Sequence, residues 1–478
     1  MSSGTWKWWL AVPAIYFLFF FALTDIGLIG PDEPRYASIG RDMALSGDWV
    51  TPRLWGELWF EKPPLLYWMI GGAHRAGLRG ELAARLPVVL LSLGFLIFYY
   101  RFLRTEFGPR PALFATVILG SSAGWLAYSQ LAVTDVPLAV TFSAAMLLGY
   151  RALERGSRRM LAVAAGLLAA AVLAKGLVPL VLALPLLWAW RGRLRRFLDP
   201  APVLVFLVIA VPWFAVLAWK TGFPFVEELF LRHHFARFSS GHQLHARPFW
   251  FYVPVLLAGF VPWTPAFVLL LRRGLFSDRR RRFLLIWVAF GFLFFSVSAG
   301  KLPGYVLPLF PAVAALIGIA VDEARDARWV LAAACATLAL VPVITGTLPG
   351  ALATGLSRAR IEGWHWWFAI TYCLMAAVIW WWEEAGRRQA AVGLLIFATV
   401  LGVVFIKVKA YPAIDRLATA RPLWRHVSTR AYLTCVEPIH RSLRYGLNYY
   451  SGKPLPDCSQ LVRPFRVQQL PGHPPFVN

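Results

Sequence analysis

The chain has 478 residues, 59% of them hydrophobic and only 15% charged, and its mean hydropathy is +0.59. This excludes an ordinary soluble protein, because such apolar content in long uncharged runs is typical of membrane spans. The formal net charge of +24 does not indicate a nucleic-acid partner. The arginines lie in short clusters between apolar runs and form no basic domain.

About thirteen apolar segments predict an all-α integral membrane protein with about thirteen transmembrane helices. The first segment is too long for the apolar region of a signal peptide, and charged residues follow it in place of a small-residue cleavage site. Lys175-Gly176 separates two segments that could also form one long tilted helix. The segments cover roughly residues 8–30, 86–103, 111–131, 135–153, 160–174, 176–190, 202–219, 249–271, 283–298, 303–321, 329–348, 366–382 and 390–407.

Arginine clusters predict the orientation of these helices. Every second short loop is rich in arginine, and the loops between them hold at most one lysine. The arginine-rich loops and the N-terminus are therefore expected in the cytoplasm. The alternation supports a break at Lys175, since one long helix would reverse the parity. Loops 31–85 and 220–248 and the C-terminal tail are then expected on the external side of the membrane.

Within loop 31–85, apolar residues at helical spacing predict one amphipathic helix after Asp32 and a second after Pro63-Pro64. Both helices are expected to lie in the interface plane with their apolar sides toward the membrane.

The tail is predicted to be a small external α/β domain, because "AYLTCVE" and "PFRVQQL" alternate like strands. We therefore expect a transmembrane domain over residues 1–407 and a C-terminal domain over 408–478. Cys435 and Cys458 lie in this tail and could pair if it is exported.

Two acidic positions on the external face of the membrane are candidate functional residues. Asp32 could cap the helix that follows it, or offer a carboxylate at the membrane surface as a base or substrate anchor, and both roles can hold at once. Glu33 is expected to support the start of this helix. Asp135 lies in a short turn between two spans, where a carboxylate is either a helix cap or a functional acid.

Lone cations on the same face are candidate phosphate ligands. Lys62 follows Glu61 directly before a proline pair, and it is either a snorkelling lysine paired with Glu61 or a ligand for a lipid phosphate. Cations at headgroup depth bind phosphate, and two acids beside them suit a sugar or an amine, so the predicted substrate is a phosphorylated lipid with a polar head. The cations of this set are Arg35, Lys62, Lys175, Arg247 and Lys301.

Segment 232–250, "RHHFARFSSGHQLHARPFW", contains four of the nine histidines, which makes a zinc ion a candidate ligand. The spacing matches no strong zinc motif, and histidines in loops are often only polar surface. If a metal binds, Glu61 could supply an oxygen from the other long loop. The sequence does not require a cofactor.

Several stretches carry a resemblance to a known family. They are "DEPRYASIGRDMALSGDWVTPRLWGELWFEKPPLLYW", "TDVPL", "AKGLVPLVL", "HHFARF", "RPFWFYVPVL" and "SAGKLPGYVLPLFPA". In these stretches the chain resembles the bacterial lipid A aminoarabinose transferases, which are C-type glycosyltransferases related to the protein O-mannosyltransferases. The resemblance runs through roughly residues 8–320, and the tail looks short for the family.

The resemblance implies an enzyme that moves a sugar, 4-amino-4-deoxy-L-arabinose, from an undecaprenyl-phosphate carrier to a lipid A phosphate or a similar periplasmic acceptor. Displacement in one step would invert the anomeric carbon. By position in the motifs, the expected catalytic residues are Asp32 and Asp135. The residues expected at the donor and its phosphate are Arg35, Lys62, Lys175, Arg247, Lys301 and Tyr305. The expected metal ligands are Glu61 and His242.

Two other functions stay open. The chain could transfer another lipid-linked sugar to a different lipid, glycan or protein. It could also be a lipid-sugar transporter or flippase, although a transporter would place its charged groups near the bilayer midplane, and here they gather at one face.

Overall fold

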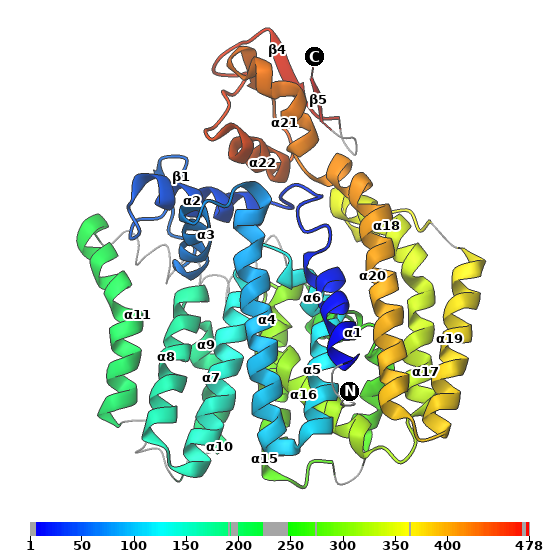
Figure 1. The fold of residues 1–478 in the computed structure, drawn as a ribbon. Coiled ribbons are helices and arrows are strands. Elements are labelled where there is room, and N and C mark those ends of the chain that lie inside the picture. Colours follow the sequence, from blue (N-terminus) through cyan, green and yellow to red (C-terminus); the bar gives the residue numbers. More distant parts are fainter. Residues whose placement is uncertain are drawn as a thin grey trace.

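The computed structural model describes residues 6–189, 192, 199–222, 247–272, 275–362, 365–470 and 475–477. Long helices lie side by side in a bundle, and a small domain from the C-terminal part of the chain stands on one end of it (Figure 1). Within the described residues, six helices are long and apolar enough to cross a membrane, or up to eight if each of two sharply bent helix pairs is one span. The chain is therefore a multi-pass helical membrane protein. The figure of about thirteen spans stays a prediction, because several apolar segments form short or bent helices.

The long helices follow the apolar segments of the sequence. The uninterrupted ones are α4 (Gly80–Phe107), α7 (Asp135–Arg155), α8 (Arg158–Lys175), α11 (Pro200–Thr221), α15 (Arg279–Val297), α19 (Trp366–Glu384) and α20 (Arg388–Ala418). Those built from consecutive pieces are α5 (Pro109–Ser121) with α6 (Ala123–Ser129), η6 (Pro303–Leu309) with α16 (Phe310–Glu323), and α17 (Arg328–Thr337) with η7 (Leu338–Leu340) and α18 (Val341–Thr354), which η8 (Leu356–Arg358) follows.

The first apolar segment is not helical over its whole length. It forms α1 (Trp6–Ile15) and a π-helical turn, η1 (Tyr16–Phe20), so the prediction of a helix through residue 30 is wrong. The carbonyls at the end of η1 are bonded elsewhere: Lys407 of α20 donates to Phe21 O at 2.8 Å and to Leu18 O at 3.3 Å. Because these carbonyls are satisfied by a neighbouring helix, the chain can leave the helical path inside the apolar region.

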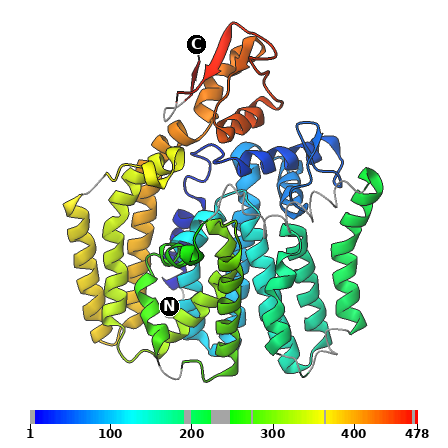
Figure 2. The same ribbon diagram turned by 180° about the vertical axis from the view of Figure 1, so that it is seen from behind.

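Two other segments are broken where the sequence contains helix breakers. α8 ends at Lys175, and Gly176, with φ of 76°, leads into the short helices α9 (Val178–Leu182) and α10 (Leu184–Ala189), so the predicted break is confirmed. Residues 249–271 form η4 (Phe249–Phe251), α14 (Tyr252–Gly259) and η5 (Thr264–Leu271), with a bend of 112° between the last two pieces (Figure 2).

Both helices predicted in the first long loop are present. They are α2 (Asp32–Ser46) and α3 (Leu65–Arg75), and the short antiparallel pair β1 (Arg53–Leu54) and β2 (Glu57–Leu58) lies between them in the sequence. The two helices touch at Gly40, where an added Cβ would lie 2.7 Å from the side chain of Ile70. Asp32 is the first helical residue and Pro31 holds the N-cap position, so Asp32 is not the helix cap. This leaves its carboxylate available for other contacts.

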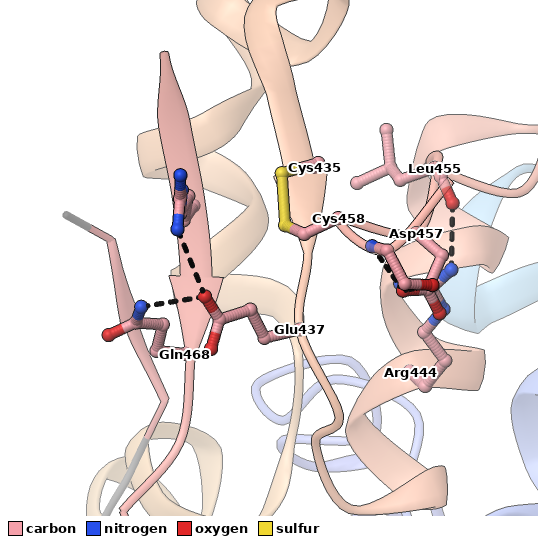
Figure 3. Close-up of a disulfide and its surroundings, with 9 residues drawn as sticks. Cys435, Glu437, Arg444, Leu455, Asp457, Cys458 and Gln468 are labelled. Carbon is pink, nitrogen blue, oxygen red and sulfur yellow. Dashed lines mark hydrogen bonds and ion pairs between the residues drawn. A yellow bond between two sulfur atoms is a disulfide. The ribbon is translucent and has the colours of Figure 1, made fainter. Parts of the chain in front are cut away.

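The C-terminal part is a small α/β unit beyond α20, which continues past residue 407 to Ala418. Its elements are α21 (Arg421–Val427), η9 (Ser428–Leu433), β3 (Thr434–Val436), α22 (Arg441–Ser451), β4 (Phe465–Gln468) and β5 (Phe476–Val477). β3 pairs with β4 in parallel and β4 with β5 antiparallel, so the strands expected in "AYLTCVE" and "PFRVQQL" are present. Cys435 of β3 forms a disulfide with Cys458 (Figure 3). Helix α22 packs against α2, which places this unit over the first loop.

Candidate functional site

A buried ion pair between Glu33 and Arg85 holds the first loop to the bundle. The guanidinium makes two parallel bonds to the carboxylate, Nε–Oε1 at 2.9 Å and Nη2–Oε2 at 2.8 Å, and both side chains are 1% exposed. The same carboxylate accepts the backbone N–H groups of Ile29 and Ala132 at 2.7 and 2.8 Å. Arg85 also donates to the carbonyls of Leu23, Ile26 and Gly27. Since Glu33 adjoins Asp32 and Ala132 precedes the turn that holds Asp135, this pair ties the two predicted acids to one end of the bundle.

Four charged side chains of the first loop form one network. Arg35 pairs with Asp32 one helical turn before it and with Glu61 at 2.9 Å, and Lys62 pairs with Glu61 at 3.2 Å. Asp32 is the most accessible of the four, with 42% of its side chain exposed against 10–13% for the others. Burial opposes the charge of Arg35, but Glu61 and Asp32 outweigh it and raise the pKa of the guanidinium above its usual range. The network therefore presents fixed cations behind one accessible carboxylate.

Aromatic rings enclose the Arg35 guanidinium. Its carbon lies 5.2 Å from the ring centre of Trp59, 5.6 Å from that of Tyr445 in α22, and 5.8 Å from that of Tyr36. Such contacts favour the cation and limit its movement. Burial, reinforced by nearby carboxylates, raises the pKa of Tyr36 and of Tyr67 well above their usual range, so both remain protonated phenols at neutral pH.

Asp135 and Lys175 form a second charged pair. The Lys175 ammonium lies 2.6 Å from Asp135 Oδ1 and 4.8 Å from the ring centre of Tyr305. The backbone of η6 approaches closely at Gly304, where an added Cβ would lie 2.6 Å from the same carboxylate oxygen and 2.7 Å from the Tyr128 ring. Asp135 begins α7 three residues after Ala132, whose backbone N–H is bonded to Glu33 of α2, so the Asp135–Lys175 pair lies at the same end of the bundle as the charged network of the first loop.

Lys301 is placed differently from the other predicted cations. It is 4% exposed and donates to the backbone carbonyls of Ser298 and Arg247, the latter at 3.0 Å. In the structure Lys301 therefore ties the start of the η4 segment to the end of α15. The Arg247 side chain is exposed.

Known proteins resemble this chain in sequence. The family described as dolichyl-phosphate-mannose-protein mannosyltransferase matches residues 61–219. The undecaprenyl phosphate-alpha-4-amino-4-deoxy-L-arabinose arabinosyl transferase of Pseudomonas aeruginosa is 33% identical over 333 residues, which are 66% of this chain and 60% of that protein. A protein of the same name from Pseudomonas fluorescens is 34% identical over 350 residues, which are 68% and 58% of the two chains.

Over 66–68% of its length the chain is similar in sequence to these arabinosyl transferases. Its matched part spans 60% of the length of the Pseudomonas aeruginosa relative. The crystal structure of ArnT from Cupriavidus metallidurans bound to undecaprenyl phosphate superposes with a TM-score of 0.78 at 26% identity, over 95% of this chain and 86% of that one. The oligosaccharyltransferase of Archaeoglobus fulgidus, with a TM-score of 0.53 at 14% identity over 96% and 65% of the chains, shares the fold alone. The resemblance seen in the sequence motifs is thus confirmed.

The predicted metal site is not supported by the described residues. Within them there is no group of three or more His, Cys, Asp or Glu side chains placed to hold a metal ion. Glu61 already pairs with Arg35 and Lys62, so a zinc ion bound there would face two positive charges. His242 lies outside the described residues, and its role as a ligand stays a prediction.

Sequence reasoning missed two parts of the site. Arg85, the partner of Glu33, is the last residue of the predicted loop 31–85, directly before a predicted span, where a lone cation could have signalled a paired acid. Tyr445, which faces Arg35 from the C-terminal unit, has no local motif that marks it.

Proposed function

We propose that the chain is a membrane glycosyltransferase that takes 4-amino-4-deoxy-L-arabinose from an undecaprenyl-phosphate carrier and passes it to a lipid A phosphate or a similar acceptor. One observation carries the proposal: the Asp32–Arg35–Glu61–Lys62 network and the Asp135–Lys175 pair gather at one end of the helix bundle. This arrangement offers cations for a phosphate and carboxylates for an aminosugar. The names of the relatives, and the undecaprenyl phosphate in the related ArnT structure, support the donor.

The cations act on the leaving group. As the bond between the sugar and the carrier phosphate breaks, the phosphate gains negative charge, which Lys62 and Arg35 would stabilise. Their existing ion pairs hold both side chains in place before the donor arrives, so little reorganisation is needed. Lys175 and Tyr305 lie together beside Asp135 and serve as further donor contacts. Lys301, held by two carbonyls, and Arg247 complete the proposed set around the η4 segment.

Asp32 is proposed as the residue that meets the reacting groups, because its carboxylate is the most accessible of the network. If the acceptor is a phosphate, it is already an anionic nucleophile, and Asp32 then orients it or pairs with the ammonium of the aminosugar. If the acceptor is a hydroxyl, Asp32 acts as general base, which contributes about 10²–10⁴-fold in rate. Asp135 and Lys175 hold the second side of the site. A single displacement inverts the anomeric carbon.

We place the site on the periplasmic side of the inner membrane, in a chain of about thirteen spans with a cytoplasmic N-terminus. The basis is the arginine alternation in the loops. Residues 1–407 would be the transmembrane domain and 408–478 the periplasmic one, and α20 extends from the first into the second and ends at Ala418.

Two experiments test the proposal. Mass spectrometry of lipid A and of the undecaprenyl-phosphate pool, with and without the gene, should show loss of the aminoarabinose adduct and accumulation of its carrier. Transfer of a different sugar would favour the alternative glycosyltransferase function. The second experiment places the protein in lipid vesicles. There a transporter would move the carrier lipid across the bilayer without forming a product.

The catalytic assignment has its own test. Asp32→Asn in purified protein should abolish transfer while the thermal unfolding temperature stays unchanged. Asp42→Asn in the same helix, a residue outside the network, is the control and should retain activity. Unchanged turnover of Asp32→Asn would refute the role of Asp32.

A further inference from the structure

A groove between α4 and α7 is lined by residues from the second half of each helix. The C-terminal ends of these two helices lie at the end of the bundle opposite the C-terminal unit (Figure 1). It encloses about 320 Å³. Its lining is apolar along most of its length and basic at one end, and consists of Gly94, Ile97, Phe98, Arg101, Phe102, Leu148 and Arg151. None of these residues belongs to the candidate site.

The α4 side of the groove is one stripe of the helix. Gly94, Ile97, Phe98 and Arg101 follow the spacing i, i+3, i+4 and i+7, so they share one face over about 10 Å of helix. Gly94 and Arg101 are exposed, and Ile97 is 57% exposed. In a multi-pass membrane protein this stripe faces lipid, with the arginine at its outer end.

The two guanidinium groups differ in how they are held. Arg151 donates to Glu106 at 2.6 Å and to the carbonyl of Phe102 at 2.8 Å, and it stacks 3.7 Å above the Phe102 ring. Arg101 stands at the rim, and within the described part of the chain it forms no ion pair. The groove thus combines one fixed cation with one that is available to an anion.

Gly94 shapes the apolar part of the groove. A glycine within a helix costs about 0.5–1 kcal/mol relative to alanine. An added Cβ at Gly94 would meet nothing within 4 Å, so close packing inside the protein does not require a glycine there. Its effect is to keep the apolar part of the groove open.

A neighbouring cavity of about 500 Å³ shares Arg151, but its character is different. Its arginines are paired with acids, Arg279 with Glu154 at 3.4 Å and Arg280 with Asp278 at 2.6 Å. The first of these pairs joins the start of α15 to the end of α7, and the second lies within the first turn of α15. The groove beside this cavity combines an apolar wall with an available cation.

We propose that this groove binds an anionic glycerophospholipid, with its phosphate between Arg101 and Arg151 and one acyl chain along Gly94, Ile97 and Leu148. The argument for this occupant is charge complementarity at the outer end together with an apolar stripe at acyl-chain depth. The proposal is independent of the transfer reaction, because the groove is at the other end of α4 and α7.

Native mass spectrometry of the full-length protein, titrated with phosphatidylglycerol or with phosphatidylcholine of the same acyl chains, tests the proposal. Phosphatidylglycerol should bind in preference. Arg101→Gln should weaken its apparent affinity by about tenfold, the loss of one charged hydrogen bond. Gly94→Leu should weaken it similarly without a change in charge, because the new side chain fills the groove.

Arg104→Gln is the matched control, since it removes the same charge from the same end of α4 at a position outside the groove lining. It should leave the affinity unchanged, and all three variants should unfold at the wild-type temperature. Equal binding of both lipids, an equal loss in Arg104→Gln, or full binding by Gly94→Leu would each overturn the proposal. Displacement of the lipid by millimolar inorganic phosphate would overturn the acyl-chain component and leave a phosphate site only.

Discussion

Asp32 and Glu33 are neighbours in the sequence and have opposite surroundings. The Asp32 side chain is 42% exposed beside Arg35, whereas that of Glu33 is 1% exposed and paired with Arg85. A helix turns by about 100° per residue, so two adjacent acids necessarily point in different directions. One faces the proposed substrate space and the other faces the bundle.

The buried pair leads to a prediction about stability. Glu33→Gln should lower the free energy of unfolding by about 3–5 kcal/mol, because it leaves Arg85 as an uncompensated buried charge. Thermal unfolding in detergent measures this. Glu57→Gln, on the exposed strand β2, should change it little. An unfolding temperature of Glu33→Gln equal to that of the wild type would contradict the structural role assigned to Glu33.

The donor phosphate leads to a second prediction at this scale. Lys62→Ala should weaken binding of an undecaprenyl-phosphate analogue by about 1.5–3 kcal/mol, the range for a charged hydrogen bond. Isothermal titration with the purified protein gives the affinity. Lys453→Ala, an exposed lysine of the C-terminal unit, is the control. If donor affinity is unaltered, Lys62 serves only to pair with Glu61.

At the scale of elements, the close approach of η6 to α7 places Asp135. Gly304 allows this contact, and an alanine there would put its Cβ 2.6 Å from Asp135 Oδ1. Gly304→Ala should therefore separate the Asp135–Lys175 pair and reduce transfer activity by at least tenfold, about 1.4 kcal/mol in the barrier.

Activity assays with saturating donor check this effect, and circular dichroism checks that the helices remain. Gly393→Ala in α20, where a Cβ meets nothing within 4 Å, is the matched control and should be fully active. Wild-type activity in Gly304→Ala would show that the position of Asp135 does not limit the reaction.

At the scale of the whole molecule, the C-terminal unit is part of the wall around the first loop. Arg41 of α2 donates to the carbonyl of Tyr449 at 2.8 Å, and the Tyr450 hydroxyl donates to Glu81 at 2.7 Å. Tyr445 lies over Arg35 and against Trp55. The structure of this unit therefore bears on the site even though its residues follow the last membrane helix.

The disulfide in this unit gives the corresponding prediction. Replacing Cys435 and Cys458 with serine together should destabilise the unit by about 2–4 kcal/mol. It should also reduce transfer, because α22 would hold Tyr445 less firmly. Limited proteolysis and thermal unfolding, with and without a reducing agent, measure the first effect. Cys373→Ser, a free exposed cysteine, is the control. If the double serine variant and the wild type behave identically, the C-terminal unit does not influence the site.

Much of the candidate site could be predicted because it lies in short local motifs. Asp32 at the start of a helix, Lys62 before two prolines and Asp135 in a turn between spans are all visible in a few consecutive residues. The network that joins Arg35 to Glu61 was not predictable in this way, since the two residues are separated by 26 positions. Tyr445 and Arg35, whose guanidinium it faces, are separated by a longer stretch of sequence still.

The sequence by itself determined the class of the protein, most of the helix positions and the break at Lys175. These follow from the apolar runs and from the positions of glycine, proline and arginine. Their effects act within a few residues or through the partition of side chains between water and lipid. Only the tertiary structure decided which charges pair, where the first helix ends and that α22 covers Arg35. Such contacts depend on how helices pack against one another, and a buried charge is stable only where that packing brings its partner within hydrogen-bond distance.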